Sequence, residues 1–133
     1  GSVFSVLQTT LGCTMECFAS PLNAHFPQFC SAFHHDLEWH FGSVGDFFDV
    51  SHTLLLQGCH EVNPPFAPGV MNQMSESLES CLEVANIHDR TLTFVVIVPT
   101  AKPANETQTA MQVSTNSSFR RMTTSAHCSQ HVV

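Results

Sequence analysis

Basic side chains are nearly absent from this sequence. Its 133 residues hold 4 Lys plus Arg against 11 Asp plus Glu, which gives a formal net charge of −7. The four are Arg90, Lys102, Arg120 and Arg121. Proteins that grip nucleic acid through its phosphates use many Lys and Arg side chains. We therefore expect any bound nucleic acid to be held by another part of a longer protein, or to be held poorly.

Long hydrophobic runs are absent as well. The longest apolar run is Phe94–Val98, far short of the roughly 20 residues that span a membrane, so no membrane partner is expected. No basic segment followed by an apolar one opens the chain, so no secretory signal is expected. The chain begins with Gly1-Ser2 and no Met, so we expect either residues added for expression or an excised fragment. A hydrophobic fraction of 43% favours one compact domain over residues 1–133.

The six cysteines include no CxxC pair, and the closest spacing is Cys13-x-x-x-Cys17. In a strand, a separation of four residues places both side chains on one face. No spacing fits a tetrahedral metal site, so we predict reduced core cysteines, surface histidines and no metal. A zinc-stabilised domain built from Cys13, Cys17 and nearby histidines is a weaker alternative.

Apolar spacing and Gly/Pro positions predict an alternation of helices and strands. The predicted elements are a helix over 3–11 ended by Gly12, a strand over 13–19, a turn over 20–23, a helix over 26–33 with Pro27 in its first turn, a loop over 34–45, a strand over 46–50, a strand over 61–66, a helix over 68–85, a strand over 91–98 and a loop over 100–118. This alternation predicts an α/β fold, with a mostly parallel sheet and helices on both faces.

Three segments are expected to meet at one edge of this sheet. Ligands of open parallel sheets bind beyond the carboxyl ends of the strands. The tetrapeptide Asn63–Phe66 lies at one such end, and the turn Ser20–Asn23 and Asp49 lie at two others. We therefore predict a ligand site formed by these segments.

The tetrapeptide Asn63-Pro64-Pro65-Phe66 suits the methylation of an amino group on an aromatic base. Such an amine is a poor nucleophile, because its lone pair is delocalised into the ring. Acceptors for both of its N–H groups shift electron density to the nitrogen, and Asn63 and the Pro64 carbonyl can supply them. Phe66 can stack on the base, an interaction worth roughly 1–3 kcal/mol. A sulfonium methyl donor is already activated, so the protein acts by positioning and electrostatics.

The tetrapeptide and Asp49 also have purely structural interpretations. Tandem prolines end the pairing of a strand, because proline cannot donate a ladder hydrogen bond. Asn63–Phe66 is then a strand-ending turn with a core phenylalanine. Asp49 is equally well explained as a solvated loop carboxylate.

Several blocks of the sequence resemble, in the same order, the phosphorylated-CTD-interacting factor family, whose activity is cap-specific adenosine-N6 methylation. The blocks are Glu16-Cys17-Phe18-Ala19-Ser20-Pro21-Leu22-Asn23, Phe26, Cys30-Ser31-Ala32-Phe33, Phe41-Gly42-Ser43, Asn63-Pro64-Pro65-Phe66, Phe94-Val95-Val96-Ile97-Val98-Pro99 and Ser129-Gln130-His131-Val132. The similarity is dense over residues 13–99 and thin over 100–133. A set of ordered blocks is far more specific than the tetrapeptide alone.

The resemblance implies methyl transfer from S-adenosylmethionine to N6 of a 2′-O-methyladenosine beside the 7-methylguanosine cap of mRNA, in the nucleus. It implies that Asn63, Pro64, Pro65 and Phe66 bind the target base, and that Ser20, Pro21, Asn23 and Asp49 lie on the cofactor side. Capped RNA is then the substrate. The C-terminal domain of RNA polymerase II is a partner through regions outside this chain, among them the WW domain of the family.

Two departures from the family pattern qualify this expectation. No glycine-rich turn precedes Cys13, so we interpret residues 13–19 as the second strand of a Rossmann-like methyltransferase sheet whose first strand and glycine turn are absent. The stretch alone is then expected to be inactive or weakly active. Ala67-Pro68 stand where the family has acidic residues. The alternative is a methyltransferase-like binding or scaffold module that has lost catalysis.

Overall fold

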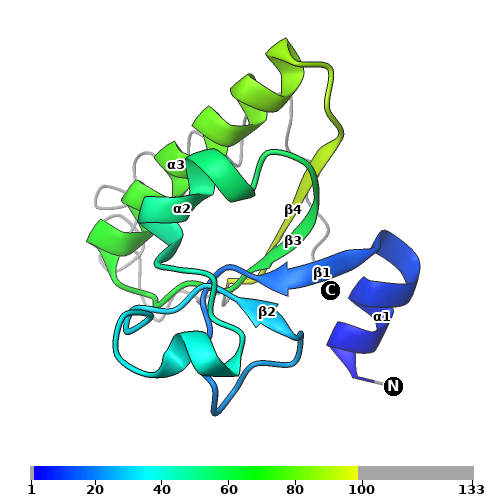
Figure 1. Cartoon of the computed structure of the whole chain (residues 1–133). Helices are drawn as coiled ribbons and strands as arrows, with labels where there is room; N and C mark the ends of the chain where they lie inside the picture. Colours follow the sequence, from blue (N-terminus) through cyan, green and yellow to red (C-terminus); the bar gives the residue numbers. More distant parts are fainter. Residues whose placement is uncertain (1, 99–133) are drawn as a thin grey trace, which may run out of the picture.

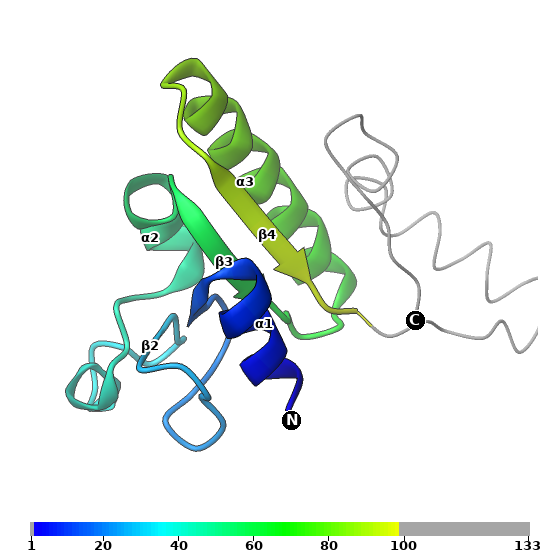
Figure 2. The same ribbon diagram turned by 90° about the vertical axis from the view of Figure 1, so that its right-hand side faces the viewer.

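The structure, a computed structural model that describes residues 2–98, contains four parallel strands between helices on both faces (Figures 1 and 2). The strands are β1 (Cys13–Glu16), β2 (Gln28–Phe29), β3 (Gly58–Val62) and β4 (Leu92–Val96), and they lie in the order β2-β1-β3-β4. The helices are α1 (Val3–Leu11), α2 (Phe47–Leu54) and α3 (Pro68–Ile87), with a short 3-10 helix, η1 (Glu38–Phe41). The predicted α/β class and parallel sheet are confirmed. The loop predicted over 100–118 lies outside the described residues.

The two helices with the clearest sequence signals form where they are predicted. The Ser2 hydroxyl caps α1 by accepting the Ser5 N–H, and Gly12 ends the helix in the left-handed conformation at φ 69°. Helix α3 begins with Pro68 at its first position, and its buried residues recur at helical spacing. None of the helices within residues 2–98 is long and apolar enough to cross a membrane.

Each face of the sheet has its own hydrophobic core. Helices α2 and α3 cover one face, where the core contains Met15, Cys17, Cys30, Phe47, Leu55, Val62, Met74 and Leu78. Helix α1 lies on the opposite face, where the core contains Leu7, Cys13, Phe26 and Cys59. Figure 2 shows α1 and α3 on opposite sides of the strands.

Cys13 of β1 and Cys17, which follows the strand, do not share a face, contrary to the prediction. The register between β1 and β3 shifts between Cys13 and Met15, and one extra residue in a strand reverses the alternation of side chains. Cys13 therefore lies on the α1 face, bonded in a disulfide to Cys59 of the neighbouring strand, whereas Cys17 is buried under α2 and α3. The prediction of reduced cysteines is wrong for Cys13 and Cys59 and confirmed for Cys17, Cys30 and Cys81, and Cys128 lies outside the described residues. The prediction of surface histidines is wrong for His60, which is buried.

The helix predicted over residues 26–33 is wrong, because the backbone there pairs with its neighbours on both sides. Gln28 and Phe29 form β2 against Met15 and Glu16 of β1. On its other side, Phe29 donates its N–H to the Gly42 carbonyl and accepts from the Val44 N–H. Such ladder bonds exclude the hydrogen bonds of a helix.

The strand predicted over residues 46–50 is also wrong, because this segment opens helix α2. The Asp46 carboxylate caps the helix by accepting the Phe48 N–H at 2.9 Å. Gly45 precedes the cap at φ 137°, and a side chain there would collide with Val50. Phe47, Ser51 and Leu55 recur at helical spacing and are buried.

The topology also corrects the prediction of an absent first strand. In a classic doubly wound sheet the strand order is 3-2-1-4-5-6, so the first strand lies between the second and the fourth. Here β1 pairs directly with β2 on one side and with β3 on the other. No further strand fits between β1 and β3. Residues Cys13–Glu16 therefore occupy the position that we had assigned to a missing strand.

The Cys13–Cys59 disulfide closes a segment with a sequence separation of 46, so its loss is predicted to lower the stability of the fold. The entropy of a loop of that size corresponds to about 4 kcal/mol. Thermal unfolding of the wild type in reductant is expected at a lower temperature than in its absence. The Cys59→Ser variant should unfold at a lower temperature in both conditions and show no response to reductant. An equal response in this variant contradicts the pairing.

Candidate functional site

A cavity of about 490 Å³ lies where the carboxyl ends of the strands meet the first turn of α2. Its lining comes from the segments after β1 (Cys17, Phe18, Ala19, Ser20, Asn23), after β2 (Cys30, Ser31, Ala32) and after β3 (Asn63, Pro64, Pro65, Phe66), from the start of α2 (Asp46, Phe47, Phe48) and from Val70 of α3. This volume is within the range of sites for cofactors and small molecules. The cavity is the site that the topology of a parallel sheet predicts.

All four residues of the predicted tetrapeptide line this cavity. Strand β3 ends at Val62, so Asn63–Phe66 is a loop at the rim and not the end of a strand. Pro64 is buried, whereas Asn63 is exposed and Phe66 is 60% exposed. The Pro65 carbonyl accepts the Ala67 N–H at 2.8 Å. The Pro64 carbonyl accepts no bond from a backbone N–H of the described residues. Asn63 and Pro64, each with an amide oxygen, are therefore residues of the cavity lining.

The turn after β1 is held by bonds among its own residues. The Asn23 side-chain oxygen accepts the Ser20 N–H at 2.7 Å and the Ser20 hydroxyl at 3.1 Å. The Ser20 carbonyl in turn accepts the Asn23 N–H at 3.1 Å. Ser20 and Asn23 line the cavity, whereas Pro21, the third residue predicted in this turn, does not. The turn follows β1 at the carboxyl edge of the sheet.

Asp46, rather than the predicted Asp49, is the carboxylate of the cavity. Asp49 lies in the first turn of α2 and is exposed, away from the lining. Only one Asp46 oxygen is used to cap the helix, so the other can accept a bond from a ligand. The sequence signal that identifies Asp46 is an Asp at a helix N-cap before the spacing Phe47, Ser51, Leu55, which the strand interpretation concealed.

Aromatic rings that the sequence analysis did not assign to the site form one wall of the cavity. Phe18 packs on Phe47 and Phe48, with ring centroids 4.7 and 5.9 Å apart. Near Ser31, which lines the cavity at the end of β2, a hydrogen-bonded chain runs from Ser31 through Ser43 to the His34 Nδ1, with distances of 2.6 and 3.1 Å. The cavity thus offers apolar surface and hydroxyl groups around one carboxylate.

The two cysteine thiols in the lining are not nucleophiles. Burial, and then the charge of Asp46, raise the pKa of Cys30 to about 12. Burial also raises the pKa of Cys17 well above its ordinary value. A thiol reacts through its thiolate, so neither group supports covalent chemistry near neutral pH.

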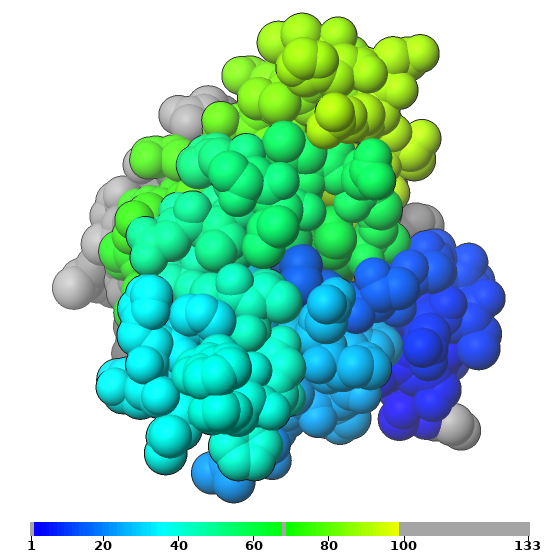
Figure 3. Space-filling model, viewed as in Figure 1, coloured from blue at the N-terminus to red at the C-terminus, as the bar shows by residue number. Residues whose placement is uncertain are grey.

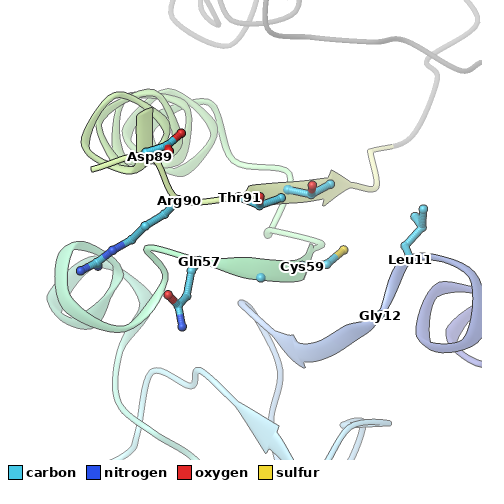
Figure 4. Close-up of a pocket in the computed structure, with 9 residues that line it drawn as sticks. Leu11, Gly12, Gln57, Cys59, Asp89, Arg90 and Thr91 are labelled. Carbon is cyan, nitrogen blue, oxygen red and sulfur yellow. The ribbon is translucent and has the colours of Figure 1, made fainter. Parts of the chain in front are cut away.

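A second cavity, of about 650 Å³, lies at the opposite edge of the sheet, at the amino ends of β3 and β4. Figure 4 shows its lining, with Arg90 extended away from Cys59 and Leu11. Arg90 is the single Lys or Arg side chain within residues 2–98. None of the residues predicted for the site lines this cavity, so it is separate from the candidate site.

Comparison with known proteins gives the family of the chain. A family model described as the phosphorylated CTD interacting factor 1 WW domain matches residues 1–133. The chain belongs to the phosphorylated-CTD-interacting factor family. The description names the WW domain, the region that the sequence analysis placed outside this chain. The match over residues 1–133 confirms membership of the family. The assignment of the chain to the catalytic portion of the family stays a prediction.

Two curated relatives in this family are 41% identical to the chain over 97 residues. Both carry the name mRNA (2'-O-methyladenosine-N(6)-)-methyltransferase, one from Homo sapiens and one from Mus musculus. The match covers 73% of this chain but only 13% of each relative. The chain therefore spans a small part of the length of these family members.

The raised pKa of Cys30 predicts slow alkylation of this family member at the cavity. At pH 8, a thiol with a pKa near 12 has roughly a thousandfold less thiolate than an ordinary cysteine. Peptide mapping after iodoacetamide treatment is expected to show Cys17 and Cys30 unmodified in the folded protein. Both should be fully modified in guanidinium. Rapid alkylation of Cys30 in the folded protein contradicts a buried neutral thiol.

Proposed function

We propose that this chain is part of the catalytic domain of an S-adenosylmethionine-dependent methyltransferase that acts on N6 of the cap-adjacent adenosine in mRNA. The observation that carries the proposal is the single cavity lined by the whole Asn63–Phe66 tetrapeptide and by the loop after β1. The names of the two relatives support the same reaction. The C-terminal domain of RNA polymerase II as partner, and the nucleus as location, belong to the same proposal.

The architecture favours the catalytic portion of the family over a WW domain. WW domains are small antiparallel sheets that bind proline-rich segments in aromatic-lined grooves. The described residues instead form a parallel sheet between helices. Such a sheet binds cofactors where the strand order reverses. In this chain that point lies between β1 and β3, below the cavity.

The cavity fits the cofactor in size and chemistry. S-adenosylmethionine supplies an electrophilic methyl group on a positively charged sulfonium. Phe18, Phe47 and Phe48 offer apolar and aromatic surface to its adenosine, and the free Asp46 oxygen offers an acceptor to its hydroxyl or amino groups. Ser20 and Asn23 line the β1 side of the same cavity. In this proposal Asp46 takes the role that the sequence analysis gave to Asp49.

The tetrapeptide residues hold and orient the target base. The Asn63 side chain and the Pro64 carbonyl accept the two N–H bonds of the adenine amino group, which raises the electron density on its nitrogen. The exposed ring of Phe66 stacks on the base, an interaction worth roughly 1–3 kcal/mol. Pro64 and Pro65 stiffen the loop that aims these acceptors. The rate enhancement comes from orientation and from fixed dipoles, so no strong base is needed.

One observation favours the alternative of a binding or scaffold module. The segment before α2 exposes Phe33, Leu37, Trp39 and Phe41, each more than half accessible. In Figure 3 this segment, coloured cyan, forms part of the visible surface below α2. Exposed apolar clusters of this kind mark surfaces that bind other proteins. A module of this kind can keep the cavity without catalysing methyl transfer.

The role of Asp46 is tested by a matched pair of variants. Asn caps a helix about as well as Asp, so Asp46→Asn should keep α2 and remove the charge. Loss of a charge-assisted hydrogen bond of 1.5–3 kcal/mol is expected to raise the Kd for S-adenosylhomocysteine by about 10- to 100-fold in calorimetry. Asp49→Asn, exposed and outside the cavity, should bind like the wild type. Equal effects of the two variants contradict the assignment.

The role of the tetrapeptide is tested in the full-length protein. Asn63→Ala is expected to abolish N6 methylation of capped RNA, measured by mass spectrometry of the digested RNA, because one acceptor for the amino group is lost. Binding of S-adenosylhomocysteine by this variant should stay within about twofold of the wild type. Full activity of Asn63→Ala refutes the proposed base site. A wild type that binds S-adenosylhomocysteine without any methylation favours the scaffold module.

A further inference from the structure

Two buried glutamates lie side by side beneath the candidate site. Glu16, the last residue of β1, and Glu61 of β3 are directly paired in the register of the two strands. Their side chains lie on the sheet face opposite α2 and α3, and the two residues are 3% and 1% exposed. Burial of a charged carboxylate is costly unless it is bonded or paired. Two adjacent ones therefore need an explanation.

The burial of Glu16 is explained by its hydrogen bonds to the loop after β1. Its Oε1 accepts the N–H groups of His25 and Phe26 at 2.5 and 2.7 Å. Residues 17–24 thus start directly after Glu16 and return to its side chain. The His25 ring stacks on Phe4 of α1 with centroids 3.9 Å apart. This arrangement fixes the far end of the loop whose Phe18–Asn23 portion reaches the cavity.

Glu61 has no such bonding. Both of its carboxyl oxygens are buried without a hydrogen-bond partner. Burial, and then the charge of Glu16, raise the pKa of Glu61 to about 7. A group in this state changes charge near neutral pH, two residues before Asn63.

Within residues 2–98, Glu16 is the carboxylate that lies beside Glu61. β1 contributes Glu16 and, at its end, the protonated thiol of Cys17. The segment after β1 contributes His25, whose Nδ1 lies 4.0 Å from Glu16 Oε2. Helix α1 and strand β4 carry no titratable side chain, and Cys13 and Cys59 are bonded to each other.

We propose that Glu16 is a positioning residue for the Phe18–Asn23 loop, and that Glu61 must be neutral for Glu16 to hold that loop. A second negative charge on Glu61 repels Glu16 within a poorly solvated space and weakens its grip on the His25 and Phe26 N–H groups. The loop then loses its anchor on the cofactor side. The inference rests on the proposed function only in the experiment that measures cofactor binding.

The direction of the pH effect follows from the raised pKa. A carboxyl that binds its proton more tightly in the folded state stabilises the fold fully below its ordinary pKa of 4.5. This contribution is lost as the pH rises through about 7. The stability of the fold should therefore decline between about pH 4.5 and 7, and the contact of Glu16 with the loop should weaken as the pH rises through about 7.

The first measurement needs no ligand. Amide hydrogen exchange at His25 and Phe26, followed by NMR at pH 6, is expected to be about tenfold faster in Glu16→Gln, because a charged acceptor is replaced by a neutral one. Glu83→Gln, on the exposed side of α3, is the matched control and should leave both rates unchanged. Unchanged exchange in Glu16→Gln, with the fold intact by circular dichroism, overturns the role of Glu16.

The second measurement follows the Kd for S-adenosylhomocysteine from pH 6 to 8.5. In the wild type and Glu83→Gln, the Kd is expected to rise about tenfold with pH, a usual size of coupling between two sites. In Glu61→Gln, which stays neutral, the Kd should change by less than twofold. Any change in the protonation of S-adenosylhomocysteine itself affects the Kd of all variants equally. A Glu61→Gln profile that follows the wild type overturns the role of Glu61. If the wild type binds no S-adenosylhomocysteine, the proposed function fails. The inference is then decided by amide exchange alone, compared at pH 6 and 8.5 in the wild type and in Glu61→Gln.

Discussion

The direct parallel pairing of β1 with β3 is the constraint on which the rest of the structure depends. These strands are separated in sequence by the segment that forms β2, η1 and α2, yet Cys13, Met15 and Glu16 pair with Cys59, His60 and Glu61. The pairing brings the loop after β1 beside the tetrapeptide after β3, so that one cavity receives both. It also forces two carboxyls into neighbouring positions on the far face. The candidate site and the buried Glu16–Glu61 pair therefore both result from the pairing of β1 with β3.

The elements that the sequence predicts are those with local signals. Helix α1 has a side-chain cap and a terminal glycine, α3 has helical apolar spacing and a proline at its first position, and β4 is a β-branched run. Two elements are predicted wrongly. Helix α2 has a local signal, the Asp46 N-cap, but residues 46–50 also suit a short strand, whereas β2 has no local signal. β2 has only two residues, and it forms because Phe29 finds partners in Glu16, Gly42 and Val44. Those partners are distant in sequence, so no local pattern reveals the strand.

The residues of the candidate site also fall into those that local sequence features reveal and those that they do not. The tetrapeptide and the Ser20–Asn23 turn are found from the sequence, because a strand end, a proline pair and polar turn residues are local features. Asp46 is missed because its role depends on whether residues 46–50 form a strand or a helix. Glu16 is missed because its role depends on a non-local contact, in which its side chain accepts bonds from the His25 and Phe26 N–H groups. The sequence shows which element holds a residue, but not which distant backbone that residue contacts.

The charge of the chain, unfavourable for RNA at first sight, agrees with the chemistry of the cavity. The sulfonium donor is cationic, and the lining offers one carboxylate and no Lys or Arg. In the proposed function the RNA phosphates do not contact this lining, and the target base enters between Phe66 and the amide oxygens of Asn63 and Pro64. The matched relatives are about eight times as long as their matched segment, since that segment is 13% of each. A protein of that length has room for basic surfaces outside this chain. We propose that this acidic chain positions the donor and the base, and that basic surfaces outside residues 1–133 bind the phosphates.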